Sequence, residues 1–389
     1  MLGLDPASPE FVRDPYPVFA RLRAEEPVAW DEERRFWALT RYDDVLAALR
    51  DDEVFSSRIT SSGGLDPIID RPSPMISDDP PDHTRLRRLV QDAFAPRRVA
   101  GWEPRIRRLV VELLDAMEPA LASGAEVDFV SSFASPLPVA VIAEILGVPL
   151  SRRRLDDWAF STALSAEESH DPEVRRRLRA DLLETLRELA RERRREPADD
   201  LLTHLVRASD QEGRLTEDEV VGLSFLLWNA AIEAPTFLFG SGMAALERHP
   251  GAKRRILDDP GLLPSFVEEV ARYDAPVQGL FRRATRDVAL RGRTIREGDK
   301  VWLLFAAANR DPERFPDPDR FDPARTPNDH LGFGGGIHYC LGSMMARLEA
   351  RLAFGLLLER FPGLHVRPEE GCRSRHPVMR GFHRLPSTL

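Results

Sequence analysis

Cys340 is the residue whose surroundings point most directly to chemistry, because it lies in a glycine-rich turn just before an expected helix. Gly334 to Gly336 lead into it. An apolar run with helical spacing follows, at Leu341, Met344, Leu348, Leu352 and Leu356. Unpaired amides and the positive end of a helix dipole favour a thiolate at such a position. The sequence therefore predicts a cysteine that serves as a metal ligand.

The segment from Phe333 to Gly342 carries the pattern F-G-x-G-x-H-x-C-x-G. This pattern resembles the haem-binding loop of the cytochrome P-450 family, in which a thiolate is the proximal ligand of haem iron. The resemblance implies haem b (iron protoporphyrin IX) as cofactor, with Cys340 on the iron and His338 at a haem propionate. A buried cysteine in an ordinary turn is the alternative, and the number of matched positions disfavours it.

Further segments resemble the parts of the family that hold the propionates. His83 and Arg87 are one helical turn apart in the segment Asp79–Arg88, so both side chains can point the same way. Buried propionates need cationic donors. By the same resemblance Arg282 is the third propionate ligand, since the R-x-A spacing favours it over its neighbour Arg283.

A structural network is also expected. Glu269 and Arg272 lie three residues apart on one face of a predicted helix. The segment from Pro312 to Phe321 resembles the family segment whose arginine, here Arg320, joins them. Such a network would fix the path of the chain that delivers Cys340.

The expected distal helix departs from the family pattern, which is typically A-G-x-(D/E)-T-T. The acid is present as Glu233, but the usual threonine is Ala234 and a proline follows at 235. Glu233 is therefore the candidate proton relay, at a catalytic position where Ala234 offers no hydroxyl. We expect Pro235 to kink the helix. Asn229 lies one turn earlier, either as a substrate contact or bonded to the neighbouring backbone.

The surrounding pattern predicts a mainly α protein with a minor β-rich part, as a single domain over residues 1–389. A hairpin is expected at Val28–Trp30 and Phe36–Leu39, and a long loop from Ser56 to Pro74, which the resemblance places at the substrate pocket. A Thr-x-x-Glu capping box at Thr216 opens a long apolar helix that runs to about Arg248. In the resembling fold, haem is buried between this distal helix and the helix after Cys340.

Composition narrows the classes of function. The formal net charge of −9 argues against nucleic acid as a partner. No run of about 18 apolar residues occurs and no secretory pattern opens the chain, so we expect a cytoplasmic protein outside the membrane. Cys372 has no ligand-type neighbour, and two cysteines make no disulfide framework.

The resemblance implies a soluble bacterial monooxygenase that inserts one oxygen atom from O2 into a small, mainly apolar substrate. Electrons would come from a ferredoxin and its reductase, docked on proximal-side arginines: Arg85, Arg88, Arg97, Arg98 and Arg347. The missing threonine leaves open a peroxide-driven oxygenase or a non-oxygenating haem-thiolate enzyme. A haem-binding sensor without turnover is a further alternative. The expected substrate-pocket wall is Ile76, Leu226, Asn229, Ala230, Val277, Leu280 and Phe382.

Overall fold

A computed structural model describes residues 2–5, 8–58, 74–148, 152–162, 171–212 and 215–389. The helices are α1 (Pro9–Arg13), α2 (Tyr16–Glu25), α3 (Tyr42–Arg50), α4 (Asp82–Val90), α5 (Pro96–Gly101), α6 (Glu103–Ala122), α7 (Pro136–Leu146), α8 (Arg152–Thr162), α9 (Pro172–Arg195), α10 (Leu201–Glu212), α11 (Glu217–Ala230), α12 (Glu233–Arg248), α13 (Pro250–Asp258), α14 (Leu263–Tyr273), α15 (Phe305–Ala308) and α16 (Ser343–Arg360). The strands are β1 (Val28–Asp31), β2 (Phe36–Leu39), β3 (Phe55–Ser56), β4 (Val127–Asp128), β5 (Leu280–Ala284), β6 (Val288–Leu290), β7 (Arg293–Ile295), β8 (Lys300–Leu303), β9 (His365–Val366), β10 (Cys372–Arg373), β11 (Phe382–Arg384) and β12 (Pro386–Thr388).

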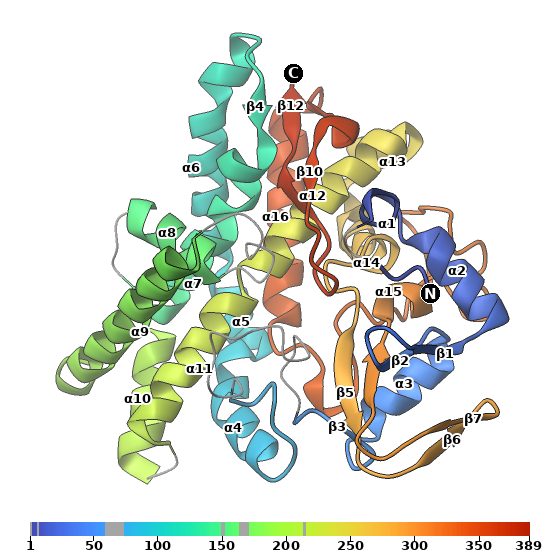
Figure 1. Cartoon of the computed structure of the whole chain (residues 1–389). Helices are drawn as coiled ribbons and strands as arrows, with labels where there is room; N and C mark the ends of the chain where they lie inside the picture. The colour runs from blue at the N-terminus through green and yellow to red at the C-terminus, as the bar shows by residue number, and fades with distance from the viewer. Residues whose placement is uncertain (1, 6–7, 59–73, 149–151, 163–170, 213–214) are drawn as a thin grey trace.

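The prediction of a mainly α fold with a minor β-rich part is confirmed (Figure 1). Most of the loop predicted from Ser56 to Pro74 lies outside the described residues.

The largest sheet joins strands from the start and the middle of the chain in the order β1-β2-β8-β5-β3. The predicted hairpin is present, because β1 and β2 pair antiparallel with Val28 opposite Leu39. Strand β2 then pairs parallel with β8, and β8 pairs antiparallel with β5. Figure 1 shows this sheet beside α3, on the opposite side of the molecule from α9 and α10. The sheet matters for the site because β5 carries Arg282.

The long apolar helix predicted to run to Arg248 is divided into α11 and α12. The predicted capping box of Thr216 and Glu219 opens α11. The break falls at Ala231 and Ile232, before Pro235, which occupies the first turn of α12 where its missing N–H is tolerated. Among the described residues, this segment (217–248) is long and apolar enough to cross a membrane by length and composition, and most of it is buried inside the fold.

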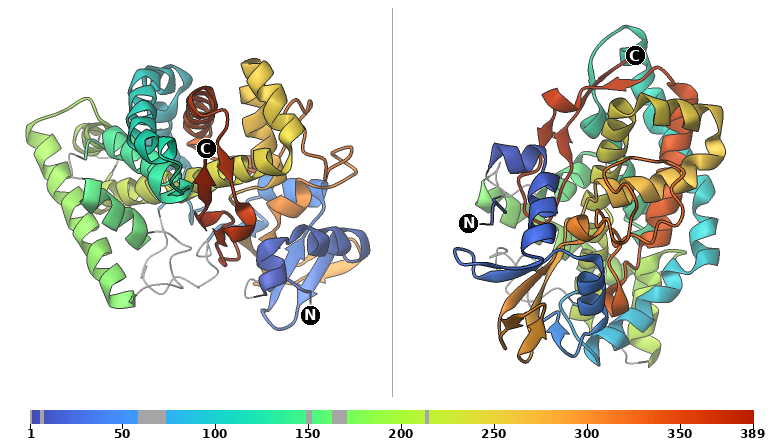
Figure 2. Two further views of the ribbon diagram at one scale, coloured as in Figure 1. Left: turned by 90° about the horizontal axis from the view of Figure 1, so that it is seen from above. Right: turned by 90° about the vertical axis from the view of Figure 1, so that its right-hand side faces the viewer.

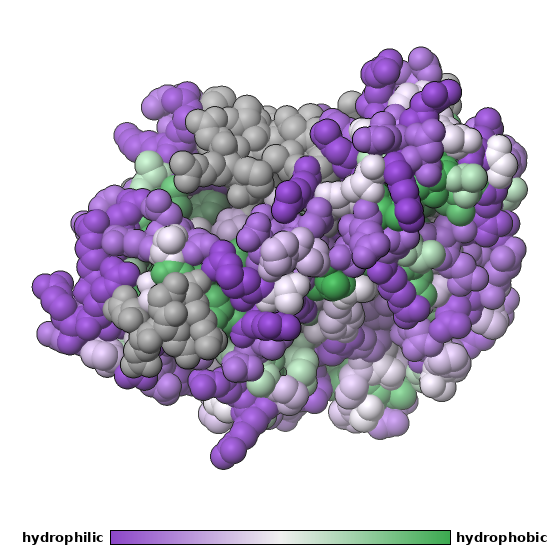
Figure 3. Space-filling view, turned by 90° about the horizontal axis from the view of Figure 1, so that it is seen from below, coloured by the Kyte–Doolittle hydropathy of each residue, from purple (hydrophilic) through white to green (hydrophobic). Residues whose placement is uncertain are grey.

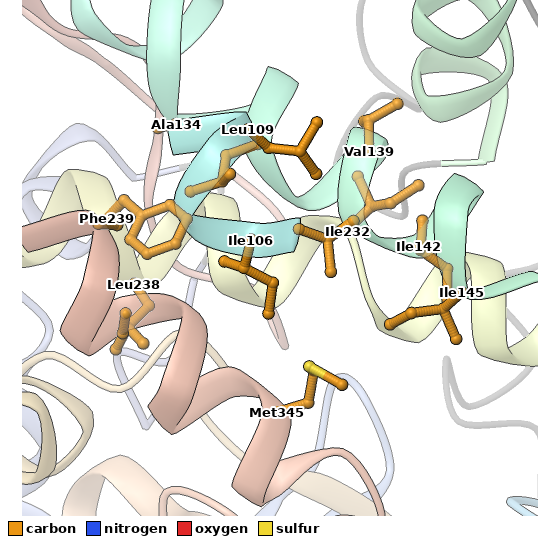
Figure 4. Close-up of a cluster of buried hydrophobic side chains, with 14 of the residues drawn as sticks. Ile106, Leu109, Ala134, Val139, Ile142, Ile145, Ile232, Leu238, Phe239 and Met345 are labelled. Atoms are coloured by element: carbon orange, nitrogen blue, oxygen red, sulfur yellow. The ribbon is translucent and has the colours of Figure 1, made fainter. Parts of the chain in front are cut away.

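Helix α16 packs against α6, α12 and α14, and contacts between aromatic rings contribute to this packing. Phe354 meets Phe239 and Phe266 edge to face, with ring centroids 5.8 and 5.0 Å apart. Figure 2 shows α6, α12 and α16 close together when the molecule is seen from above. In Figure 4, Ile232 from the break between α11 and α12 extends among the side chains of this apolar cluster. The break is therefore anchored to the core by one side chain.

Candidate functional site

Cys340 lies in a tight turn between a short 3-10 segment (Gly336–His338) and α16. Its backbone N–H donates to the carbonyl of Phe333 at 2.9 Å, and its carbonyl accepts from Ser343 N–H at 3.3 Å. The predicted position of the cysteine just before a helix is thus confirmed. The turn needs glycine at Gly336, which has a φ of +63° and where a Cβ would overlap the carbonyl oxygen of Leu49 in α3. The Cys340 loop is therefore packed directly against α3.

Burial raises the pKa of the Cys340 thiol, whereas the backbone N–H of Gly342 and the charges of Arg347 and Arg87 lower it. Burial is the largest of these effects. The start of the helix favours the thiolate, as expected, but burial outweighs this effect. A bound metal cation is what would hold this sulfur deprotonated.

The predicted propionate ligands come together from three separate segments of the chain. His83 of α4 lies beside His338, with ring centroids 4.4 Å apart and the ring planes tilted by 53°. Arg87 donates to the carbonyl of Tyr339, directly before Cys340, at 2.6 Å. Arg282 points inward from β5 and is 5% exposed, while Arg283 is turned to solvent. The choice of Arg282 over Arg283 thus agrees with the alternation of the strand.

Of these four groups, His83 and Arg282 are buried, whereas Arg87 and His338 are half-buried, and none of them forms an ion pair among the described residues. Both ring nitrogens of His83 are buried and have no hydrogen-bond partner. Burial lowers the pKa of Arg282 to about 10, and burial with the charges of Arg282, His83 and Arg87 lowers the pKa of His338 to about 3. Buried donors in this state call for an acceptor that carries negative charge. The residues present fit a haem, whose iron would take the Cys340 sulfur and whose propionates would take these donors.

The predicted ion pair between Glu269 and Arg272 is present, and both side chains are fully buried. Two parallel hydrogen bonds of 2.8 Å join the guanidinium to the carboxylate. Arg272 also donates to the carbonyls of Asn309 and Pro318, at 2.9 and 2.8 Å. The pair therefore holds the segment from Asn309 to Pro318 against α14.

The side chain of Arg320 is not part of this network, which corrects the prediction. Its side chain is 63% exposed and pairs with Asp322 at 2.9 Å, and only its backbone carbonyl accepts from Arg272. Arg325 takes the predicted place, donating to Glu269 at 3.2 Å with its side chain 10% exposed. Asn328 also donates to Glu269, at 3.2 Å. The sequence does contain a hint of these further partners. A buried glutamate has more acceptor sites than one arginine can satisfy, so Glu269 must have donors other than Arg272.

The distal helix break presents small and polar side chains next to one another. Ala230 is exposed and Ala234 is half-buried, although they flank the buried Ile232. Glu233 is 7% exposed. The hydroxyl of Thr236 donates to the carbonyl of Ile232 at 2.9 Å, so it does not replace the missing threonine.

Asn229 and four of the predicted apolar wall residues differ in how far they are buried. The Oδ1 atom of Asn229 is buried and has no hydrogen-bond partner. Ile76, Val277 and Leu280 are partly exposed, and Leu226 is 8% exposed. Their role as pocket wall stays a prediction.

Phe382, by contrast, lies in the core, which corrects its predicted place in the pocket wall. It is fully buried, its ring lies 4.0 Å from the guanidinium of Arg373, and it packs on Gly240 of α12. The reason is its strand: β11 pairs with β10, and the inward face of this hairpin is covered by α12.

Fold and site together fit a haem-binding protein. The family model described as "Cytochrome P450" matches residues 168–386. Cytochrome P450 107B1 of Saccharopolyspora erythraea is 41% identical over 405 residues, which cover 99% of this chain and 97% of that protein. The mycinamicin IV hydroxylase/epoxidase of Micromonospora griseorubida is 40% identical over 394 residues, 95% of this chain and 94% of its own. The structure of cytochrome P450 CYP109Q5 from Chondromyces apiculatus superposes with a TM-score of 0.91 at 35% identity, over 100% of this chain and 98% of that one.

The chain belongs to the cytochrome P450 family. It has the fold of that family, and haem is its cofactor. Its relatives are named as hydroxylases and monooxygenases, so the chain is an oxidoreductase.

Proposed function

We propose that this protein is a monooxygenase that inserts one oxygen atom from O2 into a small, mainly apolar substrate. The observation that carries the proposal is Cys340 in its glycine turn, close to a buried histidine, His83, whose ring nitrogens have no hydrogen-bond partner. The balanced reaction consumes O2, two electrons and two protons, and releases the hydroxylated substrate and one water. When bound, the haem supplies the binding and reductive activation of O2.

In this proposal the chain itself does three things. Cys340 holds the iron through its sulfur. The propionates of the bound cofactor would be held by His83, Arg87, Arg282 and His338. Glu233, at the start of α12, supplies protons on the distal side, where Ala234 contributes no hydroxyl.

The test of the iron ligand uses both cysteines. Cys340→Ser in the haem-loaded protein should lose the red-shifted absorption band of the reduced CO complex that thiolate ligation gives. Cys372→Ser is the matched control, since Cys372 is exposed, and it should keep the band. An unchanged band in Cys340→Ser would overturn the assignment.

Ala234 favours a second candidate, a peroxide-driven oxygenase. Hydrogen peroxide brings both the oxygen atom and the reducing equivalents, so this reaction does not depend on proton delivery by a threonine hydroxyl. Turnover with NADH, ferredoxin and reductase supports the O2 reaction, and turnover with peroxide alone supports the alternative. Binding of ligand without turnover under either condition would indicate a non-oxygenating enzyme or a sensor.

The substrate class that we infer is mainly apolar, with one hydrogen-bonding group. Alanines and aliphatic side chains surround the helix break, and the unpaired Asn229 oxygen adds one acceptor. A relative of similar length is named for its action on mycinamicin IV. A spectral binding screen against macrolides, steroids, terpenoids and fatty acids tests this class, and binding confined to highly charged ligands would contradict it.

We also propose a ferredoxin-type donor, and the cytoplasm as the place of action. Of the arginines expected at the docking surface, Arg85 is paired with Glu219 and Arg347 with Glu268. Arg88, Arg97 and Arg98 are exposed, and α5, which carries the latter two, packs against α16. Figure 3 shows a largely hydrophilic face where the molecule is seen from below. The two exposed arginines of α5, together with the exposed Arg88 of α4, fit an acidic partner.

Charge reversal tests this surface. Arg97→Glu should slow reduction by the ferredoxin several-fold at low salt and little at high salt, because exposed charges are screened. Substrate affinity should stay unchanged. The matched control is Arg254→Glu, an exposed arginine on α13. If both variants are reduced at the wild-type rate at all salt concentrations, the donor docks elsewhere.

A further inference from the structure

A groove of about 490 Å³ lies between the N-terminal helix α1, the end of α12 and the C-terminal hairpin. Figures 1 and 2 show that these three elements, far apart in sequence, are neighbours. Its lining is rich in arginine and includes one carboxylate: Arg13, Arg248, Arg373, Arg375, Glu369 and Cys372. The assigned catalytic chemistry uses none of these residues.

The innermost arginine of the groove, Arg373, is buried with only partial compensation: its guanidinium lies over the ring of Phe382 at 4.0 Å, but no carboxylate forms a hydrogen bond with its terminal nitrogens. The side chain of Arg373 is 7% exposed, and its two terminal nitrogens are buried with no hydrogen-bond partner. Its nearest anion is the buried Asp274, at 3.6 Å. That carboxylate is already used by Arg380 at 2.7 Å and by the hydroxyls of Tyr16 and Ser241, at 3.0 and 3.3 Å.

Two buried guanidinium groups thus share one buried carboxylate, which leaves an excess positive charge beneath the groove. Burying an unpaired charge is unfavourable unless a counter-ion is supplied. Arg380 is otherwise satisfied, because it donates to the carbonyls of Val12 and Arg13 at 2.6 and 3.0 Å. The excess charge therefore resides on Arg373.

The rim adds further positive charge. Arg13, Arg248 and Arg375 are exposed. Glu369, the carboxylate of the lining, accepts from Arg248 at 2.6 Å. Its side chain is 73% exposed, so it can leave this contact at little cost. An anion with more than one negative charge could then pair with Arg248 as well as with Arg373.

We propose that this groove binds a phosphate group, with Arg373 at its floor and Arg13, Arg248 and Arg375 at its rim. Arginine forks match the geometry of phosphate oxygens, and a dianion would offset the excess charge of the floor together with one rim arginine. The groove is much larger than the ion, so it has room for the organic part of a phosphate monoester. Glu369 is the side chain that must move aside.

Calorimetry on the haem-loaded protein tests the proposal with inorganic phosphate, at constant ionic strength against chloride. Saturable binding of phosphate is expected. Arg373→Met should abolish it. Because that variant removes a buried stacking partner of Phe382, the exposed double variant Arg13→Gln with Arg375→Gln provides a second test and should weaken binding about tenfold. Arg254→Gln on α13 is the matched control and should bind as the wild type does.

Glu369→Gln should change the phosphate affinity in the opposite direction from the arginine variants. It removes the carboxylate that competes for Arg248, so phosphate binding should become several-fold tighter. Glycerol phosphate then distinguishes the source: tighter binding than phosphate assigns the groove to a monoester, and equal or weaker binding assigns it to the free ion. Absence of saturable heat in the wild type overturns the proposal. So does phosphate binding that is unchanged in both the Arg373 variant and the rim double variant.

Discussion

Asn229 combines a buried oxygen without a partner and a position one turn before Glu233. A buried amide oxygen is costly to leave unsatisfied, by about 1–3 kcal/mol. Its neighbours on the helix offer no donor to it among the described contacts. A substrate hydroxyl that donates to Asn229 would remove this cost while the substrate is bound.

The unsatisfied oxygen of Asn229 predicts that the protein prefers ligands with a hydroxyl group. Wild-type protein should bind alcohols more tightly than the matching ketones, as measured by the haem absorption shift. Asn229→Leu should weaken alcohol binding by about 5- to 10-fold, or ~1–1.5 kcal/mol, and leave the ketones unaffected. An equal preference in wild type and variant would show that Asn229 is satisfied by water or backbone.

Individual site residues differ in how well the sequence predicts them. Cys340 and Arg282 could be placed because glycine turns and strand alternation are local patterns. Arg320 and Phe382 were placed wrongly because their environments depend on distant segments. In an arginine-rich chain, only the folded structure distinguishes the largely covered side chain of Arg325 from the exposed side chain of Arg320.

At the scale of elements, the ion pair of Glu269 and Arg272 ties α14 to the segment that leads toward the cysteine loop. Glu269→Gln should destabilise the protein by ~3–5 kcal/mol, since it leaves Arg272 buried without its carboxylate. Arg320→Gln should cost less than ~1 kcal/mol, because that side chain is exposed. Urea unfolding of the haem-loaded variants measures both. Equal losses for the two variants would contradict the corrected network.

The sequence predicts that the long helix is disturbed near Pro235, but it does not predict where α11 ends and α12 begins. Proline removes one intrahelical donor, and the carbonyl four residues earlier, that of Ala231, loses its partner. The sequence therefore predicts a disturbance. Its location before Pro235 follows from packing, because Ile232 is held in the apolar core (Figure 4). That contact could not be inferred from periodicity.

At the scale of the whole molecule, we expect His376 to make the stability of the fold depend on pH. Burial lowers its pKa to about 4, and its Nδ1 accepts from the N–H groups of Val378 and Met379, at 3.2 and 3.3 Å. The folded state thus favours the neutral ring. The unfolded chain binds a proton near pH 6.5, so this stabilisation is complete above pH 6.5 and is lost as pH falls toward 4.

His376→Asn keeps an acceptor at the same reach and removes the titration. We expect the variant to lose roughly 1–3 kcal/mol less than wild type between pH 7 and pH 4, measured by urea unfolding. His365→Asn, at an exposed histidine, is the control and should follow wild type. Parallel pH profiles for all three proteins would exclude His376 as a source of acid sensitivity.

The overall architecture was predictable as a class, and several elements were correct, including the β1–β2 hairpin and the capping box of α11. Long-range pairings were not. The parallel contact of β2 with β8 joins residues more than 250 positions apart, as in Phe36 opposite Lys300. Nothing in local patterning specifies such a partner. The assignment of all 389 residues to one domain stays a prediction.

The proposed haem ligands are dispersed along the chain, and this has a consequence for biosynthesis. The ribosome makes α4 and its histidine early, β5 and its arginine much later, and the cysteine turn near the end. Folding during translation proceeds from the N-terminus. Until α16 has emerged, the nascent polypeptide has donors for the propionates but no thiolate for the iron. We therefore expect the chain to bind haem stably only when its synthesis is almost complete. Ribosome-bound chains that stop before residue 340 should not retain the cofactor.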